Sequence, residues 1–574
     1  MVWTRLTEGL SEALRTAGWF TPERVERIEL SIPRDETHGD WTTNLALVLA
    51  KEVRQPPRQV AEKLAAAFPS DPSWFDAAEV AGPGFLNFRY SPGFLEGLPG
   101  RIRQEGERFG SADHGRGVTV QVEYVSANPT GPLNVVNARA AAVGATLVRL
   151  LDFTGHRAAG EFYVNDAGAQ VDLLGASVAA RFAERVGVER PFPELGYRGS
   201  YLAELAATLP ETEARAALAE GRDHWFRDQA LEQMVAWQRR DLHDYGTEFA
   251  LWVRESSLHD SGAVADTLAA LGARGMTYRA RQPEEFRGDR PPAREEADDL
   301  GEATFLRTAR FGDDMDRVVM RGNGAPTYLL PDIAYHRDKR ARGFRHVIDL
   351  WGPDHHGYVA RMKAALQALG LEPDFLEVLI VQQVNLLSGG QPVKMSKRAG
   401  EFITLRDLMD EVGPDCAKFF FLMRTTSAHL DFDLDLARQQ NDQNPAYYVQ
   451  YAHARIASLL RYAGERGLSP RADRSGPGFE APEERALIRR LAAFPEVVRG
   501  AALAREPHRL PTYLQETAAD FHRFYHACRV VSDDRERSAT RLELADAARI
   551  TLHNGLALMG VSAPERMTRD EEAA

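Results

Sequence analysis

The feature that most constrains the fold is a β-branched run that ends in a turn and is followed at once by a helix. The run VTVQVEYV, residues 118–125, has the continuous apolar composition of a strand buried in a parallel sheet. The segment NPTGP then breaks the chain, and residues 134–151 have the pattern of a helix. This order begins an α/β nucleotide-binding sheet, in which ligands bind at the carboxyl ends of the strands. We therefore expect a ligand site beside Glu123.

Length and composition limit the class of protein. A chain of 574 residues is too long for one hydrophobic core, so three or four domains are expected. No apolar run is long enough to cross a bilayer, and the charged N-terminus is typical of an amphipathic helix rather than a signal peptide. Cys416 and Cys528 are too few for a disulfide framework or a cysteine zinc site. We expect a cytoplasmic protein with no membrane attachment and no structural metal.

The net charge of −13 argues only weakly against a nucleic-acid partner. Binding RNA requires a local basic surface, not a basic total. Basic clusters occur at residues 336–345 and 485–490, although each taken alone is typical of a solvated helix face.

The pattern along the chain predicts three domains. Residues 1–108 are expected to form a small α/β domain and residues 109–415 a larger α/β domain. The larger domain should contain a helical insertion at about 175–245 and a flexible, proline-bearing loop at about 280–302. Residues 416–574 show nearly unbroken helical periodicity with no strand-like run, which predicts a helix bundle.

Within these domains some elements can be placed. Residues 41–68 have a helical pattern, and the strand-like run GPGFLNFRY follows at residues 82–90. Three further strand-like runs are RVVMRG (317–322), HVIDLWG (346–352) and EVLIVQQV (377–384).

Three common motifs are missing. The sequence has no GxxxxGK[ST] loop, no GxGxxG after a strand and no HExxH helix. Their absence argues against a P-loop ATPase, a dinucleotide dehydrogenase and a zinc protease.

The loop LLSGGQPVKMSKRAGEF carries the strongest signal. Lys394 and Lys397 lie three apart, with Ser396 between them, after Gly389 and Gly390. Two lysines on a mobile loop can stabilise the negative charge that builds on ATP phosphates as pyrophosphate leaves. A solvated basic loop is the ordinary alternative, but the tetrapeptide KMSK is specific enough to favour ATP chemistry. It resembles the KMSKS signature of class I aminoacyl-tRNA synthetases.

The segment WGPDHHGYV, residues 351–359, follows a predicted strand. Its adjacent histidines point in different directions and have no evident third partner, which argues against a zinc site. A seat for adenosine, formed by backbone and side chains ahead of the lysine loop, is the better interpretation.

Five polar side chains form a candidate pocket for a planar cation. They are Glu123, Ser126, Asn128, Tyr328 and Asp332. The last two are four apart and so share one face if their segment is helical. A guanidinium matches two carboxylates with its donor fork and can lie against an aromatic ring. Taken singly each residue could be structural, and contact between the two segments is inferred only from the resemblance that follows.

Taken together, these segments resemble bacterial arginyl-tRNA synthetase over essentially the whole chain. The blocks that carry the resemblance, in the family's order, are THGDWTTNLALVLAK (37–51), YVNDAG (163–168), YLLPDIAYH (328–336), WGPDHHGYV (351–359), NPAYYVQYAHARI (444–456) and GLALMGVSAPERM (555–567). The resemblance implies a class I Rossmann-like catalytic domain with a parallel sheet. It also implies a small N-terminal α/β domain that binds the tRNA elbow and a C-terminal all-α bundle that binds the anticodon.

The implied activity is ligation of arginine to tRNA(Arg). ATP, accompanied by Mg²⁺, would form an arginyl-adenylate once tRNA is bound, and the arginyl group would pass to the terminal ribose. The chain is expected to be a monomer. By position, the five pocket residues match the arginine site, while Asp354, His355, Lys394 and Lys397 match the ATP site. Phe85 and Asn87 match candidate contacts to the tRNA elbow.

One segment departs from the family. After NPTGPL the family carries His-x-Gly-His, whereas this chain has Asn134, Val135, Val136 and Asn137. We expect Asn134 and Asn137 to take the catalytic places, because an asparagine keeps an N–H donor but cannot carry positive charge. At the ATP-binding place of Val136, two methyl groups would occupy space that a glycine leaves open for adenine.

Several interpretations stay open. The chain is a synthetase with altered ATP contacts, or an adenylation-deficient paralogue that binds tRNA or arginine as a regulatory or accessory factor, or a sequence altered by design or by error. The intact lysine loop and arginine pocket favour the first, and the triple replacement favours the second. An RNA-binding module on the same fold and a ligase for a small acceptor are further alternatives, which the pocket and the terminal domains respectively disfavour.

Overall fold

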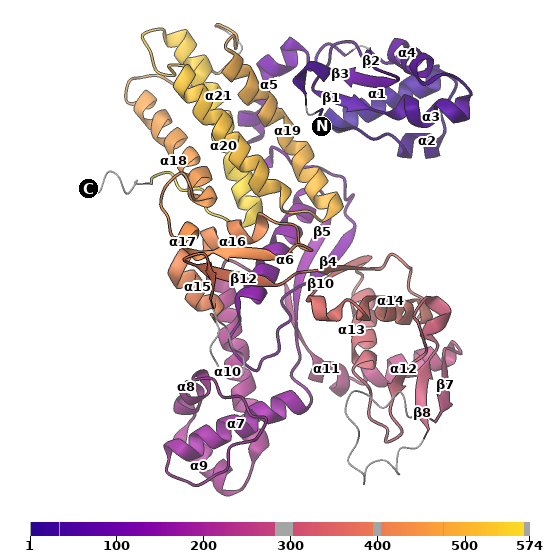
Figure 1. The fold of residues 1–574 in the computed structure, drawn as a ribbon, viewed down its shortest axis with the longest axis vertical. Coiled ribbons are helices and arrows are strands. Elements are labelled where there is room, and N and C mark those ends of the chain that lie inside the picture. The colour runs from indigo at the N-terminus through magenta and orange to yellow at the C-terminus, as the bar shows by residue number, and fades with distance from the viewer. Residues whose placement is uncertain are drawn as a thin grey trace.

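A five-stranded parallel sheet in the order β11-β10-β4-β5-β6 lies at the centre of the molecule (Figure 1). The computed structural model describes residues 2–33, 35–69, 71–281, 302–393, 403–473 and 476–567. The strands are β4 (Thr119–Glu123), β5 (Arg157–Val164), β6 (Leu251–Arg254), β10 (His346–Trp351) and β11 (Leu376–Ile380). All neighbouring strands pair in parallel. The predicted parallel sheet is confirmed, and because its strands are parallel their carboxyl ends meet at one edge.

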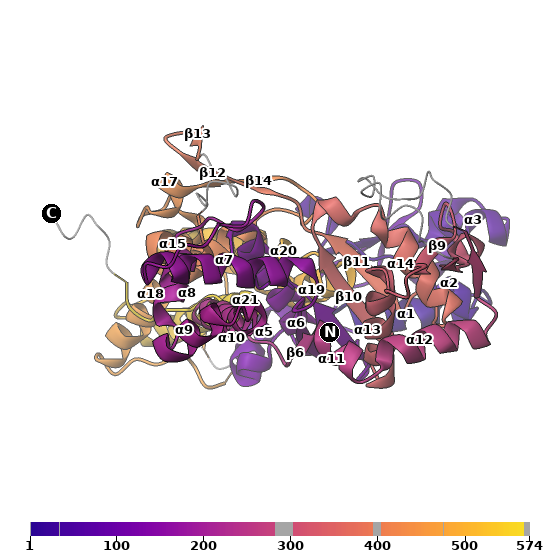
Figure 2. The same ribbon diagram turned by 90° about the horizontal axis from the view of Figure 1, so that it is seen from below.

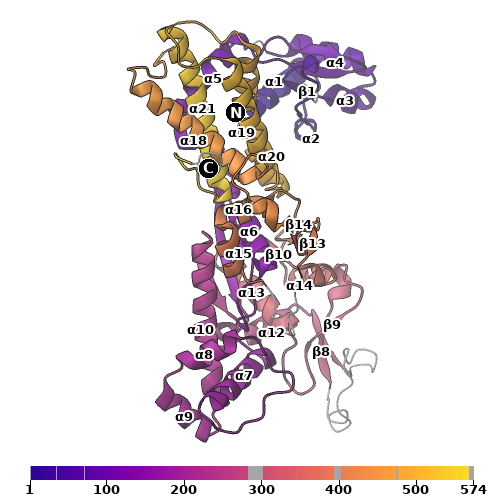
Figure 3. The ribbon, with the colours of Figure 1, turned by 60° about the vertical axis from the view of Figure 1, so that its left-hand side comes forward.

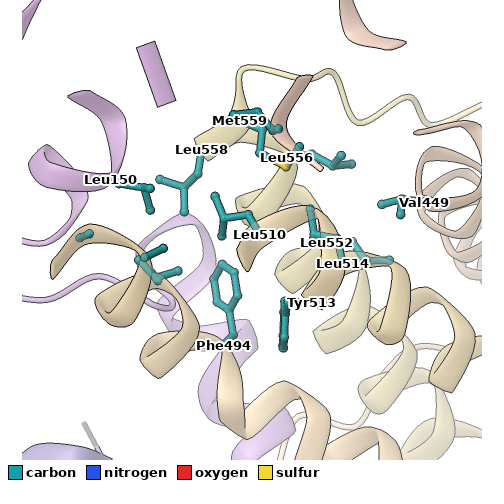
Figure 4. Packing of buried hydrophobic residues seen from close by; sticks show 14 of the residues in the cluster. Leu150, Val449, Phe494, Leu510, Tyr513, Leu514, Leu552, Leu556, Leu558 and Met559 are labelled. Atoms are coloured by element: carbon teal, nitrogen blue, oxygen red, sulfur yellow. The ribbon is translucent and has the colours of Figure 1, made fainter. Parts of the chain in front are cut away.

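Helix α6 (Val135–Phe153) follows β4 and connects the sheet to the C-terminal helices. Its buried side chains include Leu150, which lies in one apolar core with Leu510, Leu556 and Leu558 (Figure 4). Burying a leucine side chain contributes about 1.5–3 kcal/mol. The shared core therefore attaches the helix that begins at NVVN firmly to the C-terminal bundle.

Arg139, in the second turn of α6, also attaches this helix to loops far away in the sequence. Its side chain is fully buried and donates hydrogen bonds to the backbone oxygens of Gln382 (2.9 Å), Ala428 (2.9 Å) and Thr425 (2.8 Å). Burial lowers the pKa of Arg139 to about 10. Gln382 lies just before β12 (Val384–Ser388), so the segment that leads to the lysine loop is bound to α6.

The N-terminal region forms a small three-stranded antiparallel sheet with helices, in the order β1-β3-β2. Its elements are α1 (Val2–Thr16), α2 (Pro22–Glu26), β1 (Trp41–Thr43), α3 (Leu45–Val53), α4 (Pro57–Ala67), β2 (Glu79–Ala81), β3 (Phe85–Phe88) and α5 (Pro92–Glu105). The strand expected at residues 82–90 is confirmed as β3. The single helical pattern expected over residues 41–68 was partly wrong. It begins with a strand, and Arg54, with a φ of 54°, and then Pro57 divide the remainder into two helices.

The chain between β5 and β6 is helical and lies at the end of the molecule opposite the N-terminal region (Figure 3). Its helices are α7 (Ala169–Arg185), α8 (Tyr201–Thr208), α9 (Glu211–Ala219) and α10 (Asp223–Asp244).

After β6 the chain forms a mixed unit beside the sheet (Figure 1). Its elements are α11 (Glu255–Asp260), α12 (Ala263–Ala273), β7 (Thr277–Ala280), β8 (Ala303–Leu306), β9 (Arg317–Met320), α13 (Leu329–Ala341) and α14 (Tyr358–Ala368). The strands expected at 317–322, 346–352 and 377–384 are confirmed as β9, β10 and β11. Of the loop expected at about 280–302, residues 282–301 lie outside the described part of the chain.

The remaining chain is mostly helical. Across all the described ranges of the protein, no helix is long and apolar enough to cross a membrane. Its elements are β13 (Gln391–Pro392), α15 (Leu405–Val412), α16 (Pro414–Leu422), β14 (Leu430–Asp433), α17 (Leu434–Ala437), α18 (Pro445–Gly464), α19 (Pro482–Ala504), α20 (Arg509–Ala527) and α21 (Arg535–Met559). The expectation of no strand beyond residue 416 was wrong, because β14 pairs in parallel with β12 (Figure 2). Only Leu430 and Phe432 are buried in this four-residue strand, too few to produce a recognisable alternation.

Candidate functional site

Glu123, the last residue of β4, is held by hydrogen bonds to both of its carboxylate oxygens. The Ser126 hydroxyl donates to Oε1 at 2.9 Å, and the Lys339 ammonium donates to Oε2 at 2.6 Å. The same Ser126 oxygen accepts from the backbone N–H of Tyr163 in β5 at 3.1 Å. Burial raises the pKa of Glu123 in spite of the ammonium beside it. The structure thus brings the predicted residues Glu123 and Ser126 into direct contact.

A strained turn orients Ser126. Val125 and Ser126 have φ angles of 69° and 37°, in the left-handed region that favours glycine. Such residues cost on the order of 1–3 kcal/mol each and persist where the surroundings over-determine them, frequently at functional sites. Here the turn places the Ser126 hydroxyl between Glu123 and the backbone of Tyr163.

The other predicted carboxylate, Asp332, lies in the first turn of α13, with Tyr328 directly before the helix. Burial and the negative charge of Glu123 raise the pKa of Asp332 well above its usual range. The Tyr358 hydroxyl donates to its Oδ2 at 3.1 Å. Tyr328 is 56% exposed as a residue, and its ring centroid lies 6.1 Å from that of Tyr358. The charge of Asp332 raises the pKa of the Tyr328 hydroxyl. Tyr328 therefore presents an open aromatic surface next to a buried carboxylate.

The structure adds two residues that the sequence interpretation missed. Glu255 is buried at the start of α11, directly after β6, and burial raises the pKa of its carboxyl. Tyr163 is buried near the end of β5, and burial followed by the charges of Glu255, Asp332 and Glu123 raises the pKa of its hydroxyl. Both lie at the carboxyl ends of parallel strands. The strand-like run before Tyr163 could have indicated that residue, whereas Glu255 required β6 to be placed in the sheet.

These carboxylates make the pocket strongly acidic. In the described part of the chain, no lysine or arginine forms an ion pair with Asp332 or Glu255, and His259 lies 3.8 Å from Glu255. Buried carboxylates without a charged partner cost free energy that a bound cation recovers. The arrangement therefore suits a ligand with a positively charged, planar group beside an aromatic ring.

Asn128, in the turn after β4, contacts the helical insertion. Its exposed side chain donates to Oε1 of Gln170 in α7 at 2.9 Å, and its carbonyl oxygen accepts from Nε2 of Gln238 in α10 at 3.2 Å. Two residues later, the carbonyl oxygen of Thr130 accepts from the Tyr201 hydroxyl at 2.7 Å. The helical insertion thus holds the NPTGP turn in place.

Asn134 and Asn137 begin α6 and bond to each other's backbone. Asn134 Oδ1 accepts from the N–H groups of Val136 (2.9 Å) and Asn137 (3.1 Å), and Asn137 Oδ1 accepts from the N–H of Asn134 (3.0 Å). This is a reciprocal capping box, which stabilises the first turn of a helix. The side chain of Val136 is half-buried and packs against the apolar core. The helix N-terminus therefore stays well formed, with its positive dipole end intact.

The chain after the lysine loop lies against this helix start. Asn134 forms an antiparallel bridge with Thr404, and the N–H of Leu405 donates to the carbonyl oxygen of Leu133 at 2.8 Å. Thr404 forms a second capping box with Asp407 at the start of α15. The N-termini of α6 and α15 thus lie next to each other. The predicted residues Lys394 and Lys397 lie outside the described residues, although the loop that carries them ends here.

Asp354 and His355 lie in a 3₁₀ turn, Pro353–His355, that follows β10. Both side chains are exposed, and the His355 ring centroid is 6.2 Å from that of Trp351. Because β10 pairs in parallel with β4, these residues are on the same edge of the sheet as the start of α6.

Phe85 and Asn87 lie on β3, far from this edge (Figure 1). Phe85 is 37% exposed and lines a cleft of about 620 Å³ together with Trp3 and Arg499. Asn87 is buried, and its Oδ1 accepts from the Thr42 hydroxyl at 2.7 Å. Phe85 is therefore accessible to a partner, whereas the Asn87 side chain is used within the small sheet.

The sequence matches three protein families. Residues 4–90 match the arginyl tRNA synthetase N terminal domain, residues 103–260 the class I (R) tRNA synthetase catalytic domain, and residues 449–567 the DALR anticodon binding domain.

Named proteins are similar along the whole chain. An arginine–tRNA ligase of Bacillus subtilis (strain 168) is 42% identical over 566 residues, which cover 98% of each chain. The crystal structure of a putative arginyl-tRNA synthetase from Campylobacter jejuni is 33% identical, with a TM-score of 0.73, and the match covers 83% of this chain and 100% of that one. The arginyl-tRNA synthetase of Thermus thermophilus, 24% identical with a TM-score of 0.76, shares the fold over 99% of this chain and 100% of its own.

Proposed function

This chain belongs to the arginyl-tRNA synthetase family, and on that premise we propose that its NVVN-bearing site activates arginine with ATP. The chain is an arginine–tRNA ligase of class I, which joins arginine to tRNA in protein synthesis. The proposal concerns how this site performs the chemistry without the His-x-Gly-His signature.

The acidic pocket is the observation that carries the proposal. Glu123, Asp332 and Glu255 supply negative charge for the guanidinium, and the exposed ring of Tyr328 offers it a face. Ser126 fixes Glu123, and Asn128 is assigned to the amino-acid end of the substrate. A site that had lost its amino-acid substrate would gain nothing from keeping these carboxylates buried, because each costs free energy when empty.

On the ATP side, we assign phosphate binding to Lys394 and Lys397 and to the N-terminus of α6. The amide oxygens of Asn134 and Asn137 are used in the capping box. Among the described residues their NH₂ groups have no recorded acceptor, which makes them the donors available to phosphate oxygens. Asp354 and His355 are assigned to adenosine, which lies beside Val136. The positive charge that the two histidines would have supplied then comes from the lysines and the helix dipole.

The reaction follows from these assignments. A carboxylate oxygen of arginine attacks the α-phosphorus of ATP, which enters with its Mg²⁺ as substrate, and the bond to pyrophosphate breaks. The lysine loop and the start of α6 stabilise the charge that collects on pyrophosphate. A hydroxyl of the tRNA's terminal ribose then attacks the arginyl carbonyl carbon and releases AMP.

We assign tRNA(Arg) to the two terminal domains. Residues 1–108 would bind the tRNA elbow, with Phe85 exposed for that contact and Asn87 behind it, and residues 416–574 would bind the anticodon. Residues 109–415 would form the catalytic domain between them. The protein would act as a cytoplasmic monomer, without membrane attachment or a structural metal.

The test is arginine-dependent ATP–pyrophosphate exchange, measured with and without tRNA(Arg). Exchange that appears only with tRNA is the expected result, and Lys397→Ala should abolish most of it because a cation is lost from the phosphates. Absence of exchange, with arginine and tRNA binding intact, would overturn the proposal. It would favour the alternative of an adenylation-deficient paralogue that binds tRNA or arginine as an accessory factor.

A further inference from the structure

Lys339 is a fully buried lysine directly beneath the arginine pocket. Its ammonium group donates to Glu123 at 2.6 Å and to Asp349 at 3.0 Å, and it lies 4.3 Å from the ring centroid of Tyr335. Burial alone would lower the pKa of Lys339, but Asp349 and Glu123 outweigh that effect and raise it. The residue is therefore a charged ammonium inside the protein, with its donors directed at two carboxylates.

The position of Lys339 in α13 links the two predicted guanidinium partners. Asp332, His336 and Lys339 are spaced by four and three residues, so they share one face of the helix. His336 Nδ1 lies 2.8 Å from the backbone oxygen of Asp332, and its Nε2 lies 2.9 Å from Asp349. One face of α13 thus carries the pocket carboxylate Asp332 and, two turns later, Lys339, whose ammonium group binds the second pocket carboxylate, Glu123.

We propose that Lys339 is a positioning residue for arginine recognition. Its ammonium group keeps the Glu123 carboxylate ionised and holds it in place beside Asp332. The inference deepens the proposed function and rests on it, because it assumes that Glu123 binds the guanidinium. Lys339 does not touch the substrate in this scheme. Its effect reaches the ligand only through Glu123, whose second oxygen is fixed by Ser126.

The surroundings of Glu123 explain why a cation is needed there. Glu123 is the last residue of a buried strand, and Asp349 adds negative charge near it. The charged and titratable groups that bear on it or line this side of the sheet are Lys339, His336 and Asp332 of α13, Arg342 after α13, Asp349 of β10, Glu161 and Tyr163 of β5, Tyr328 before α13, and Glu255 and His259 of α11. Without the ammonium, Glu123 would take up a proton more readily and would lose attraction for a guanidinium.

Removing the charge should weaken arginine binding more than catalysis. An opposite charge at this distance shifts a carboxyl pKa by about 1–3, so Lys339→Met should raise the arginine dissociation constant about 10- to 1,000-fold near neutral pH. The loss should shrink as the pH rises, because Glu123 then ionises without help. A purely structural role for Lys339 would not produce this pH dependence.

The binding assay is equilibrium dialysis of labelled arginine against the full chain with tRNA(Arg) and without ATP. Lys339→Met is compared with Glu123→Gln and with the double variant, so that the coupling between the two residues is measured. In the Glu123→Gln background, Lys339→Met should change arginine affinity by less than about threefold, because the two changes act through the same carboxylate.

Arg342, which directly follows α13, provides a matched control. It forms a bidentate ion pair with Glu161 of β5, one strand away, and contacts neither Glu123 nor Asp332 in the described structure. Arg342→Met removes a partly buried cation from the same face of the sheet. It should lower thermal stability while leaving arginine affinity unchanged within about twofold.

Among the described residues, Lys339→Met leaves Asp349 with His336 as its remaining side-chain partner, and the variant could fail to fold. The combined change Lys339→Gln and Asp349→Asn removes one charge of each sign and serves in its place. Because Asp349 raises the pKa of Glu123, its removal offsets part of the effect, so the loss of affinity should be smaller, with the same direction of pH dependence. Unchanged arginine affinity in a folded variant at every pH would overturn the inference. Normal arginine binding by the unaltered chain without pyrophosphate exchange would overturn the proposed catalysis only, so the two failures are distinguishable.

Discussion

The two halves of the active site are built on different principles. On the arginine side, the buried Lys339 and the half-buried Glu123 and Ser126 form a continuous hydrogen-bond network, and Asp332 is fixed by Tyr358. On the ATP side, the described groups are a helix N-terminus and exposed side chains such as His355.

The difference explains how one half could change while the other is retained. A buried carboxylate network cannot lose one member without leaving a neighbour's charge uncompensated. A helix N-terminus binds anions through backbone N–H groups, which every residue type except proline supplies. The replacement of three signature residues by NVVN therefore removes charged side-chain donors but leaves the positive dipole end of the helix, provided that the helix still begins at the same residue. The Asn134–Asn137 capping box fixes that start and uses the N–H groups of Asn134, Val136 and Asn137 to do so.

The largest effect that would sharpen this comparison is expected from Asp332→Ala. A guanidinium that loses a buried charged partner binds more weakly by about 2–5 kcal/mol, or about 30- to 3,000-fold, so KM for arginine should rise by that factor. KM for ATP should change little. Tyr358→Phe is the control, since it removes only one hydrogen bond to Asp332 and should cost about fivefold. Pyrophosphate exchange measures all of these, and an equal rise in KM for ATP would show that the two halves are not separate.

The next effect concerns the ATP side. The combined change Asn134→His, Val136→Gly and Asn137→His restores charged donors and the open space for adenine. It should raise the exchange rate about tenfold or more, because one donor at a developing charge is worth about 10²- to 10³-fold in kcat. The same change breaks the capping box and should cost about 0.5–2 kcal/mol of stability, visible in thermal unfolding. The single variant Val136→Gly measures the effect of the space for adenine apart from the effect of the histidine donors. An unchanged exchange rate in the triple variant would show that the nucleotide is held elsewhere.

These predictions start from features that the sequence already indicates, because the signals involved are local. The β-branched run, the proline–glycine turn and the asparagine N-cap each act within a few residues, so β4 and the start of α6 follow from them. Strand β14 could not be found in this way, because its four residues become a strand only by pairing with β12.

The deeper part of the site depends on three-dimensional contacts. Lys339 lies 216 residues from Glu123 in the sequence and could equally be a solvated lysine on a helix rich in charge. Glu255 is one of many acidic residues until β6 is placed in the sheet. Their roles require the order of the strands, which no local pattern encodes.

A smaller effect is expected in how the stability of the arginine-free protein depends on pH. Burial and Glu123 raise the pKa of Asp332, so the folded protein binds a proton there more tightly than the unfolded chain does. Stability of the arginine-free protein should therefore fall as the pH rises from the ordinary carboxyl range through this raised pKa. Arginine binding requires the ionised form, so the increase in melting temperature caused by arginine should grow as the pH rises from the ordinary carboxyl range through the raised pKa. A constant increase across that range, measured by calorimetry, would contradict the assignment of Asp332.

The smallest effect is expected at the strained turn. Val125→Gly relieves the positive φ angle but adds backbone freedom to the unfolded chain, so stability should change by less than about 1 kcal/mol. The looser turn should place Ser126 less accurately and raise KM for arginine about two- to threefold, in line with part of one hydrogen bond. Val125→Ala keeps the strain and serves as the control. A larger effect of alanine than of glycine would mean that the valine side chain, and not the turn, matters.

Arg139 and the residues that it contacts differ in how well they should tolerate mutation. Its partners Gln382, Thr425 and Ala428 contribute only their backbone oxygens, so their side chains can be exchanged without touching the contact. The arginine itself has no such freedom, because no other side chain offers five donors in a planar fork. One side chain thus holds two parts of the ATP side together, the start of α6 and the segment that leads to the lysine loop, while the side chains of the loops that it joins remain free to diverge.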